Sequence, residues 1–158
     1  MPRVYISIGS NMSDPVKQVR RGVDVLRFFG EVAAVSPFYR SKPWGTVTDQ
    51  PDFINAVVAL DTDRPPRELL NALKAEEVRL GRTSGERWGP RAIDFDILIY
   101  GDETVDEYDL RIPHPRMNER AFVLVPLADL DARYSEVRDA LTAEELSSVA
   151  PLGATKRV

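Results

Sequence analysis

The spacing of apolar and polar residues along the chain predicts strands that alternate with two long helices. Alternating or continuous apolar runs are typical of strands, and they occupy residues 3–8, 32–39, 53–60 and 93–100. A helical repeat follows Ser13, the expected cap of the first helix with Asp14 in its first turn, and another follows the pair Pro65–Pro66. The two helices are expected to end at Gly30 and Gly81.

The order strand, helix, strand, strand, helix, strand is typical of a ferredoxin-like α+β sandwich. In that fold, helices pack on one face of a mostly antiparallel sheet. The turn-rich segment 41–52 is too long for a simple connection, and the arginine-rich segment that leads into the strand at 93–100 is expected to be a second long loop. Beyond them the pattern predicts four further segments: a polar hairpin or meander over 101–115, a short helix over 118–122, a strand or helix over 124–130, and a helix over about 142–149.

Length and composition predict a single domain. The chain has 158 residues, of which 43% are hydrophobic and 29% charged, so residues 1–158 are expected to share one core, with 131–158 as a C-terminal helix and tail. No apolar run has the length of a membrane span, and the N-terminus has no signal-peptide layout. Because cysteine is absent, we expect a protein of the reducing cytoplasm without thiolate metal sites.

The charge is distributed unevenly along the chain. The net charge of -4 argues against a general nucleic-acid binder. Residues 79–91 nevertheless hold four arginines, Arg79, Arg82, Arg87 and Arg91, against the single acidic Glu86. A basic loop in an acidic protein indicates a small anionic ligand rather than a long polyanion.

Two aspartates share one face of the strand expected over 93–100. Side chains alternate between faces, so Asp94 and Asp96 point the same way. The opposite face is expected to hold Ile93, Phe95, Ile97 and Ile99. Two carboxylates roughly 6 Å apart repel by roughly 3 kcal/mol at an effective dielectric of about 20. Mg²⁺ would relieve this repulsion, and a pair of ions sharing such ligands is typical of phosphate transfer. The alternative is an exposed strand face that is merely acidic.

The arginines ahead of this strand suggest phosphate chemistry, and a glutamate of the second helix is a further candidate. Guanidinium groups bind phosphate through two hydrogen bonds, so Arg82 and Arg91 are candidates to neutralise a transferring phosphoryl group, unless they belong to a solvated basic loop. Glu77 falls within the apolar stripe of the second helix. A carboxylate there needs a partner, unless the helix end has already reached the surface.

Aromatic residues and the histidine extend the candidate site. Trp44 and Trp88, the two tryptophans of the chain, both fall in the long loops and could cover a flat ligand or simply pack locally. His114 lies between two prolines and near Arg116 and Arg120, which favours a phosphate contact about as much as a structural role.

Five segments together resemble the 6-hydroxymethyl-7,8-dihydropterin pyrophosphokinase family of folate biosynthesis. They are YISIGSN at 5–11, FYRSKPWG at 38–45, DQPDFINAVVAL at 49–60, GERWGPRAIDFDILIYG at 85–101 and IPHPRMNERAFVLVPLADL at 112–130. The resemblance implies that ATP transfers its terminal pyrophosphoryl group to the hydroxymethyl oxygen of the dihydropterin and leaves as AMP. It implies no nucleic-acid or membrane partner.

The resemblance also implies roles for individual residues. Asp94 and Asp96 would hold two Mg²⁺ ions with ATP, and Arg82 and Arg91 would be catalytic. The pterin would be bound by Ser41, Lys42, Trp44, Phe53, Asn55, Trp88 and Phe122. ATP would be bound by Glu77, Arg87, Trp88, Arg91, Ile97, Arg111, His114 and Arg120. Phosphate contacts from 83–86 and 109–111 stay open, because these residues depart from the family pattern.

Two other functions remain as alternatives. A non-catalytic ligand-binding module on a ferredoxin-like fold would not need the aspartate pair. A Mg²⁺-dependent phosphatase or nuclease would use the same carboxylates, but it would not explain the aromatic residues at the ligand.

Overall fold

The computed structural model describes residues 1–12, 14–43, 50–81 and 92–152. Its elements follow one another as β1 (Arg3–Ser10), α1 (Pro15–Leu26), β2 (Glu31–Val35), β3 (Tyr39–Ser41), β4 (Phe53–Asp61), α2 (Pro66–Arg79), β5 (Asp94–Tyr100), β6 (Val105–Glu107), β7 (Leu110–Ile112), α3 (Ala121–Leu130), α4 (Ser135–Asp139), α5 (Ala143–Ser147) and β8 (Val149–Pro151). Single 3₁₀ turns at Met117–Glu119 and Ala132–Tyr134 flank α3. No helix within the described ranges is long and apolar enough to cross a membrane.

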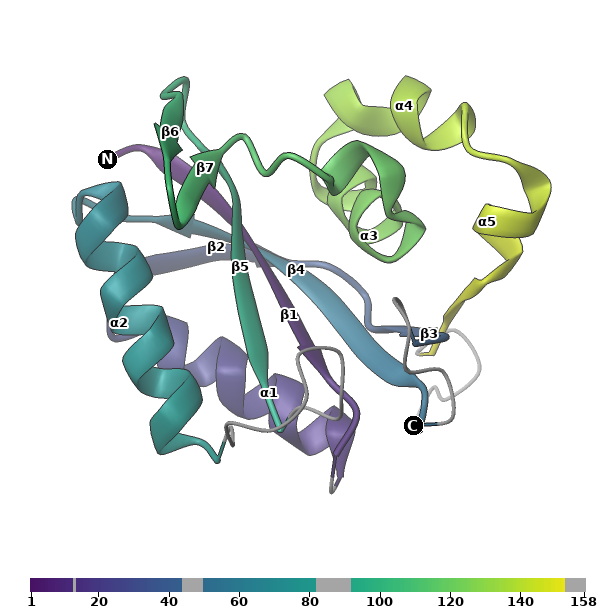
Figure 1. The fold of residues 1–158 in the computed structure, drawn as a ribbon, viewed down its shortest axis with the longest axis horizontal. Coiled ribbons are helices and arrows are strands. Elements are labelled where there is room, and N and C mark those ends of the chain that lie inside the picture. Colours follow the sequence, from purple (N-terminus) through teal and green to yellow (C-terminus); the bar gives the residue numbers. More distant parts are fainter. Residues whose placement is uncertain (13, 44–49, 82–91, 153–158) are drawn as a thin grey trace.

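The strands form an antiparallel sheet in the order β5-β1-β4-β3-β8, with β2 also paired to β4 (Figure 1). Strands β6 and β7 form a separate hairpin. The sheet and its helices confirm the predicted ferredoxin-like α+β class. Helices α1 and α2 share one face, as the sequence predicts, and α3 packs on the opposite face.

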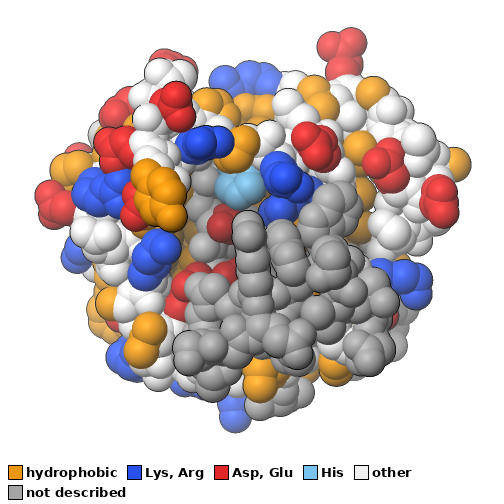
Figure 2. Space-filling view, viewed as in Figure 1, with side chains coloured by type: hydrophobic (Ala, Val, Ile, Leu, Met, Phe, Trp, Pro, Cys, Tyr) orange, Lys and Arg blue, Asp and Glu red, His pale blue; other side chains and the backbone are white. Residues whose placement is uncertain are grey.

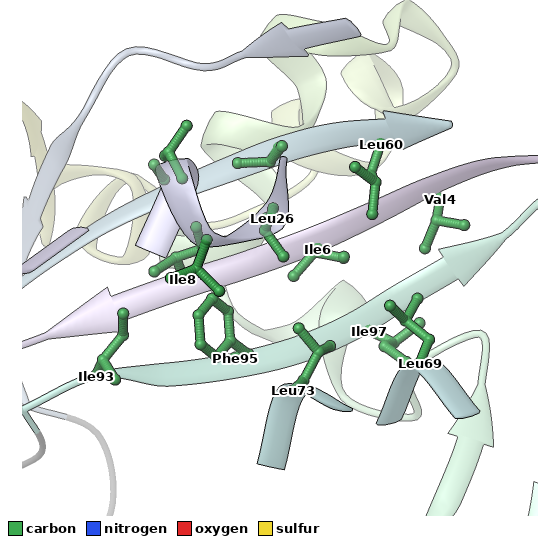
Figure 3. Packing of buried hydrophobic residues seen from close by; sticks show 14 of the residues in the cluster. Val4, Ile6, Ile8, Leu26, Leu60, Leu69, Leu73, Ile93, Phe95 and Ile97 are labelled. Carbon is green, nitrogen blue, oxygen red and sulfur yellow. The ribbon is translucent and has the colours of Figure 1, made fainter. Parts of the chain in front are cut away.

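The main core lies between the sheet and the helices α1 and α2. Figure 3 shows Ile6 and Ile8 of β1 packed against Phe95 of β5 and Leu73 of α2. The predicted apolar stripe of α2 is buried here, including Leu69 and Leu73. Full burial of such side chains stabilises the fold by roughly 1.5–3 kcal/mol each. This core fixes the strands that carry the site on their other face.

A bulge in β5 changes which side chains face the core. The register of β1 with β5 shifts between Tyr5 and Ile6, so Leu98 is an extra residue on β5. Beyond the shift, Ile99 packs with Leu98 on the α3 side. The expectation that Ile99 shares a face with Phe95 is therefore wrong, because the strict alternation ends at the bulge.

The strand predicted over 32–39 is interrupted in the structure. Strand β2 ends at Val35 and β3 begins at Tyr39. Pro37 has no backbone N–H. The Ser36 hydroxyl accepts the Val57 N–H at 2.9 Å, in place of a carbonyl of the ladder. The Ser36 N–H still donates to Val57 O at 2.9 Å, so a side-chain acceptor replaces one of the two backbone hydrogen bonds at this position.

The second half of the chain agrees with its prediction in part. Residues 124–130 are helical within α3, although Pro126 lies inside that helix. The short helix expected over 118–122 is one 3₁₀ turn, and α3 starts directly after it. The helix expected over 142–149 is α5, started by a capping box of Thr142 and Glu145. Strand β8, which follows it, was not predicted.

The cap of the first helix also differs from the prediction. Ser13 lies outside the described residues, and the Asp14 side chain accepts the Lys17 N–H at 3.3 Å. Asp14 is therefore the N-cap rather than a residue of the first turn. Serine and aspartate are both common N-cap residues, so the sequence alone does not decide between two that are adjacent.

Candidate active site

A row of paired residues crosses the sheet on the face against which α3 packs. Gly9 of β1 lies opposite Asp94 of β5 on one side and opposite Asn55 of β4 on the other. Asn55 in turn lies opposite Tyr39 of β3. Paired residues share a face and neighbouring strands are about 4.8 Å apart, so Asp94 and Asn55 are about 10 Å apart on one surface. The register thus brings the predicted metal and pterin positions together.

The aspartate pair lies on this face as predicted. Asp94 and Asp96 are half-buried, whereas Phe95 between them is buried in the core of the opposite face. Arg120, just before α3, lies within electrostatic reach of both carboxylates. Burial lowers the pKa of Arg120, and the negative charges of Asp96 and Asp94 act in the opposite direction. The Arg120 guanidinium is therefore close enough to the pair for their charges to interact.

The donor set suits a hard cation that arrives with other ligands. Among the described residues, no three Asp, Glu, His or Cys side chains are grouped so that they alone could hold a metal ion. Mg²⁺ commonly uses one or two carboxylates and completes its shell with water and phosphate oxygens. Two half-buried carboxylates on one strand face fit that pattern.

Glu77 is buried and bonded, so the alternative that the end of α2 has surfaced is wrong. Its side chain is 3% exposed, and Oε2 accepts the Phe95 N–H at 2.8 Å. Phe95 stands between Asp94 and Asp96, and the Glu77 bond therefore holds the strand at the aspartate pair. A carboxylate on an apolar stripe needs a hydrogen-bond partner, and this backbone N–H is one such partner.

Asn55 is the buried polar centre of the predicted pterin site. Its Nδ2 donates to Ser41 Oγ at 2.6 Å, and both side chains are buried. A Cβ at Gly9 would lie 3.1 Å from Asn55 Oδ1 and 3.8 Å from the Phe53 ring, so a glycine lets the amide lie close against β1. Residues of three strands, β1, β3 and β4, therefore fix the position of this amide.

Phe122 lies on the α3 side of the sheet beside Arg120. It belongs to the first turn of α3, packs partly buried with that side of the sheet, and lies under the Arg120 guanidinium, 5.7 Å from ring centroid to Cζ. Phe53 begins β4 on the same face as Asn55. Lys42, also predicted to contact the pterin, is exposed at the end of β3.

A cavity of about 380 Å³ has Asp96 in its lining. Its lining comes from α2, β5, the β6–β7 hairpin and the following loop: Leu70, Phe95, Asp96, Ile97, Tyr108, Asp109, Leu110, Arg111, His114 and Pro115. Figure 2 shows the histidine near the centre of this face, with acidic and basic side chains around it. The structure thus brings Ile97, Arg111 and His114 together beside Asp96.

His114 is held as a neutral ring. Its backbone N–H donates to Leu98 O at 2.8 Å, and its Nδ1 accepts the Arg116 N–H at 3.2 Å. Burial, with the positive charges of Arg120 and Arg116, lowers the pKa of His114 to about 4. A neutral ring that accepts at Nδ1 carries its proton on Nε2, so His114 presents an uncharged donor.

The lowered pKa of His114 predicts a loss of stability in acid. In the unfolded chain the histidine has a pKa of about 6.5 and is protonated at a higher pH than in the folded protein. The free energy of unfolding therefore falls as the pH drops from about 6.5 towards 4. Between pH 7 and 5 the wild type should lose about 1 kcal/mol more than His114→Gln, after discounting for partial exposure of the ring. Urea unfolding at both pH values measures this. Parallel losses in the two proteins would contradict the neutral assignment.

The predicted residues and the residues that line the cavity overlap in part. Trp44, Arg82, Arg87, Trp88 and Arg91 lie outside the described residues. Leu70, Tyr108 and Leu110 line the cavity but were not predicted. The apolar stripe of α2 did include Leu70, whereas Tyr108 had no signal beyond its place in a polar hairpin.

Comparisons with known proteins agree on one family. A family model described as 7,8-dihydro-6-hydroxymethylpterin-pyrophosphokinase (HPPK) matches residues 5–132. The chain is 48% identical over 130 residues to a 2-amino-4-hydroxy-6-hydroxymethyldihydropteridine pyrophosphokinase of Pseudomonas aeruginosa, covering 81% of this chain and 80% of that one. It is 42% identical over 128 residues to the protein so named in Bacillus subtilis, covering 80% and 76%.

Solved structures show the same fold at low identity. A crystal structure of an HPPK-DHPS protein in complex with substrates matches 99% of this chain with a TM-score of 0.70 and 12% identity. Wild-type Plasmodium falciparum HPPK-DHPS matches with a TM-score of 0.68 and 13% identity. The chain spans 45% of the length of each of these chains. From the family model and the sequence relatives, the chain belongs to the 7,8-dihydro-6-hydroxymethylpterin-pyrophosphokinase family.

Proposed function

We propose that this protein transfers pyrophosphate from ATP to the hydroxymethyl group of 6-hydroxymethyl-7,8-dihydropterin, giving the dihydropterin diphosphate and AMP in folate biosynthesis. The hydroxymethyl oxygen attacks the β-phosphorus of ATP, the bond from that phosphorus to the α–β bridging oxygen breaks, and the hydroxyl proton leaves to solvent. The observation that carries the proposal is the strand register, which sets Asp94 and the buried Asn55 about 10 Å apart on one face. That spacing suits a pterin whose hydroxymethyl group reaches a triphosphate held at the aspartates.

The aspartates and the cavity form the ATP side of the site. Asp94 and Asp96 would hold Mg²⁺, two ions by family resemblance, which would offset the charge of the triphosphate when bound. Arg120 interacts electrostatically with both carboxylates and would contact phosphate oxygens beside them. His114 would donate Nε2–H without adding charge. The cavity beside Asp96 has room for the rest of the nucleotide.

The amide and two aromatic rings form the pterin side. Asn55 is buried and would read the polar edge of the pterin, since an amide both donates and accepts. Ser41, which accepts a hydrogen bond from Asn55, sets the orientation of that amide. Phe53 and Phe122 would enclose the flat ring system between them. Lys42 would contact the pterin from the rim.

The long loops would complete the reaction site. Arg82 and Arg91 would stabilise charge on the transferring group, with Arg87 at the ATP phosphates. Trp44 would lie against the pterin, and Trp88 would contact both substrates. These five roles rest on the family motif that the loops carry.

We also propose that residues 1–158 form one pyrophosphokinase domain in which the C-terminal part supports the pterin strand. Val149 of β8 lies opposite Ser41 of β3, and the Leu152 N–H donates to Phe38 O at 2.9 Å. Val149 also packs with Tyr39 and with Ala121 of α3. The segment after residue 132, where the family match ends, therefore braces the strand that carries Ser41.

The reaction is tested by the nucleotide product. ATP, Mg²⁺ and 6-hydroxymethyl-7,8-dihydropterin should give AMP and dihydropterin diphosphate in equal amounts, whereas a phosphatase or ordinary kinase would give ADP. Asn55→Ala should raise KM for the pterin by about tenfold and leave KM for ATP unchanged, because it removes a buried hydrogen-bonding group. ADP as the product, or turnover without the pterin, would refute the assignment. Ligand binding without Mg²⁺ or turnover would instead favour a non-catalytic module.

A further inference from the structure

The turn of the β6–β7 hairpin presents a fully exposed tyrosine at the cavity. Glu107 pairs with Leu110, so the turn consists of Tyr108 and Asp109. Tyr108 is 101% exposed in the free protein, yet it is among the residues that line the cavity. Its ring therefore gains no burial from the fold and would gain burial from a ligand.

One arginine holds this turn on both sides of the tyrosine. Arg67, in the first turn of α2, donates from Nη1 to Asp109 Oδ2 at 3.0 Å and from Nη2 to Glu107 Oε1. Its Nη2 is also 2.9 Å from Asp109 Oδ1. The hydrogen bond from Arg67 lowers the pKa of Asp109, so the pair stays ionised at neutral pH. Tyr108 stands between the two anchored residues, which limits where its backbone can move.

The cavity beside this turn has an apolar part and a polar part. Leu70, Ile97 and Leu110 are apolar, and Ile97 and Leu110 are buried in the core. Asp96, Arg111 and His114 supply the charges and donors. A ligand that suits both parts has a flat apolar ring joined to an anionic group, which is the chemistry of a nucleotide with its base among the leucines.

We propose that Tyr108 is a nucleotide-binding residue whose ring covers the base of ATP, and that Arg67 is the positioning residue that holds it there. This rests on the proposed function, in which ATP occupies this cavity. Aromatic rings bind bases by stacking, which tolerates different bases and depends on ring area rather than on the hydroxyl. The exposed ring and the anchored turn thus act as one side of the base site.

The test separates the base from the phosphates. Binding of Mg²⁺ with α,β-methylene-ATP, and of Mg²⁺ with inorganic tripolyphosphate, is measured by calorimetry on the full chain. Tyr108→Ala should weaken the nucleotide analogue by about tenfold, the usual scale of base–aromatic stacking, and leave tripolyphosphate unchanged. Tyr108→Phe should bind the analogue within about twofold of wild type, because it keeps the ring.

A control and a second variant make the outcome decisive. Phe28→Ala removes an aromatic ring that is 80% exposed and does not line the cavity, and it should change neither affinity. Arg67→Met should raise KM for ATP by a smaller factor than Tyr108→Ala, with kcat and the pterin KM unchanged, because it frees the turn without removing the ring. Loss of both affinities in Tyr108→Ala, or of neither, would overturn the proposal. Binding is measured without turnover, so the two proposals can fail separately. A failed AMP assay would refute the reaction but not the binding result. Unchanged binding in Tyr108→Ala would refute the role of Tyr108 but not the reaction.

Discussion

Asp96→Asn is expected to lower kcat by about 100-fold or more while the protein stays folded. The substitution keeps the size and the strand position of the side chain and removes one of two negative charges on this face. Groups aimed at the charge of a transferring phosphoryl unit typically account for about 10²–10³ in rate, and a carboxylate that helps to hold Mg²⁺ against the triphosphate belongs to this class. Asp94→Asn should act in the same direction.

The same substitution should not reduce the stability of the free protein. Two carboxylates on one strand face repel by roughly 3 kcal/mol at about 6 Å and an effective dielectric of about 20, so removing one relieves part of this. The lost attraction to Arg120 offsets part of this gain, so Tm is expected to stay the same or rise slightly. Loss of activity without loss of Tm separates a role in the reaction from a role in the fold.

The measurement is the rate of AMP formation at several Mg²⁺ concentrations, with thermal unfolding of each variant. Asp102→Asn is the matched control, because Asp102 is an exposed aspartate just beyond the end of β5. It should keep the wild-type rate. Near-normal rates in both Asp94→Asn and Asp96→Asn would refute the metal role of the pair.

Local patterns predicted those parts of the fold and site that depend on one element at a time. The alternation of β5 placed Asp94 and Asp96 on one face, and the helical stripe of α2 placed Leu69, Leu73 and Glu77 in the core. Each follows from the period of its own strand or helix. The buried environment of the stripe also demanded a partner for Glu77, and the structure supplies the Phe95 N–H.

Features that depend on distant pairings had no local signal. Strand β8 is three residues long, and only its position beside β3 makes it a strand. The bulge at Leu98 comes from the register with β1, and it reverses the face of Ile99. Arg67 meets Glu107 and Asp109 across about forty residues of sequence, so a charge pattern read along the chain does not show it.

The identity of the pterin substrate follows neither from local patterns nor from distant pairings. The residues by themselves indicated Mg²⁺-dependent phosphoryl-type transfer, because an aspartate pair and arginines suit any triphosphate. The pterin followed from the family motifs, and the structure adds that Asn55 is buried against Ser41 and Gly9 on the same face as the aspartates. The amide alone does not distinguish a pterin from another planar heterocycle.

Glu77→Ala is expected to destabilise the protein by about 2–3 kcal/mol and to lower activity at the same time. The Glu77 carboxylate is 3% exposed and accepts the Phe95 N–H, and β5 is the last strand of the sheet on that side. Removing the acceptor leaves a buried N–H of the edge strand unsatisfied, which costs about 1–3 kcal/mol, and the smaller side chain leaves a gap. In a domain of this size the change should lower Tm by roughly 4–12 °C.

The activity should fall because Phe95 lies between Asp94 and Asp96. Loosening the backbone there spreads the two carboxylates over more positions, so we expect a higher Mg²⁺ requirement and a roughly tenfold lower kcat. Glu76→Ala is the matched control. Glu76 is the neighbouring residue, its Oε1 pairs with Arg79 at 2.7 Å, and the loss of this surface pair should cost less than about 1 kcal/mol.

Glu77→Gln distinguishes support of the strand from direct contact with ATP. The amide keeps an oxygen that can accept the Phe95 N–H, so support of the strand predicts stability within about 1 kcal/mol of wild type and an unchanged Mg²⁺ requirement. A direct contact of the carboxylate with ATP predicts the opposite pattern, in which KM for ATP rises in Glu77→Gln although Tm is retained. If Glu77→Ala were as stable and as active as Glu76→Ala, the bond to Phe95 would not hold the aspartate pair in place.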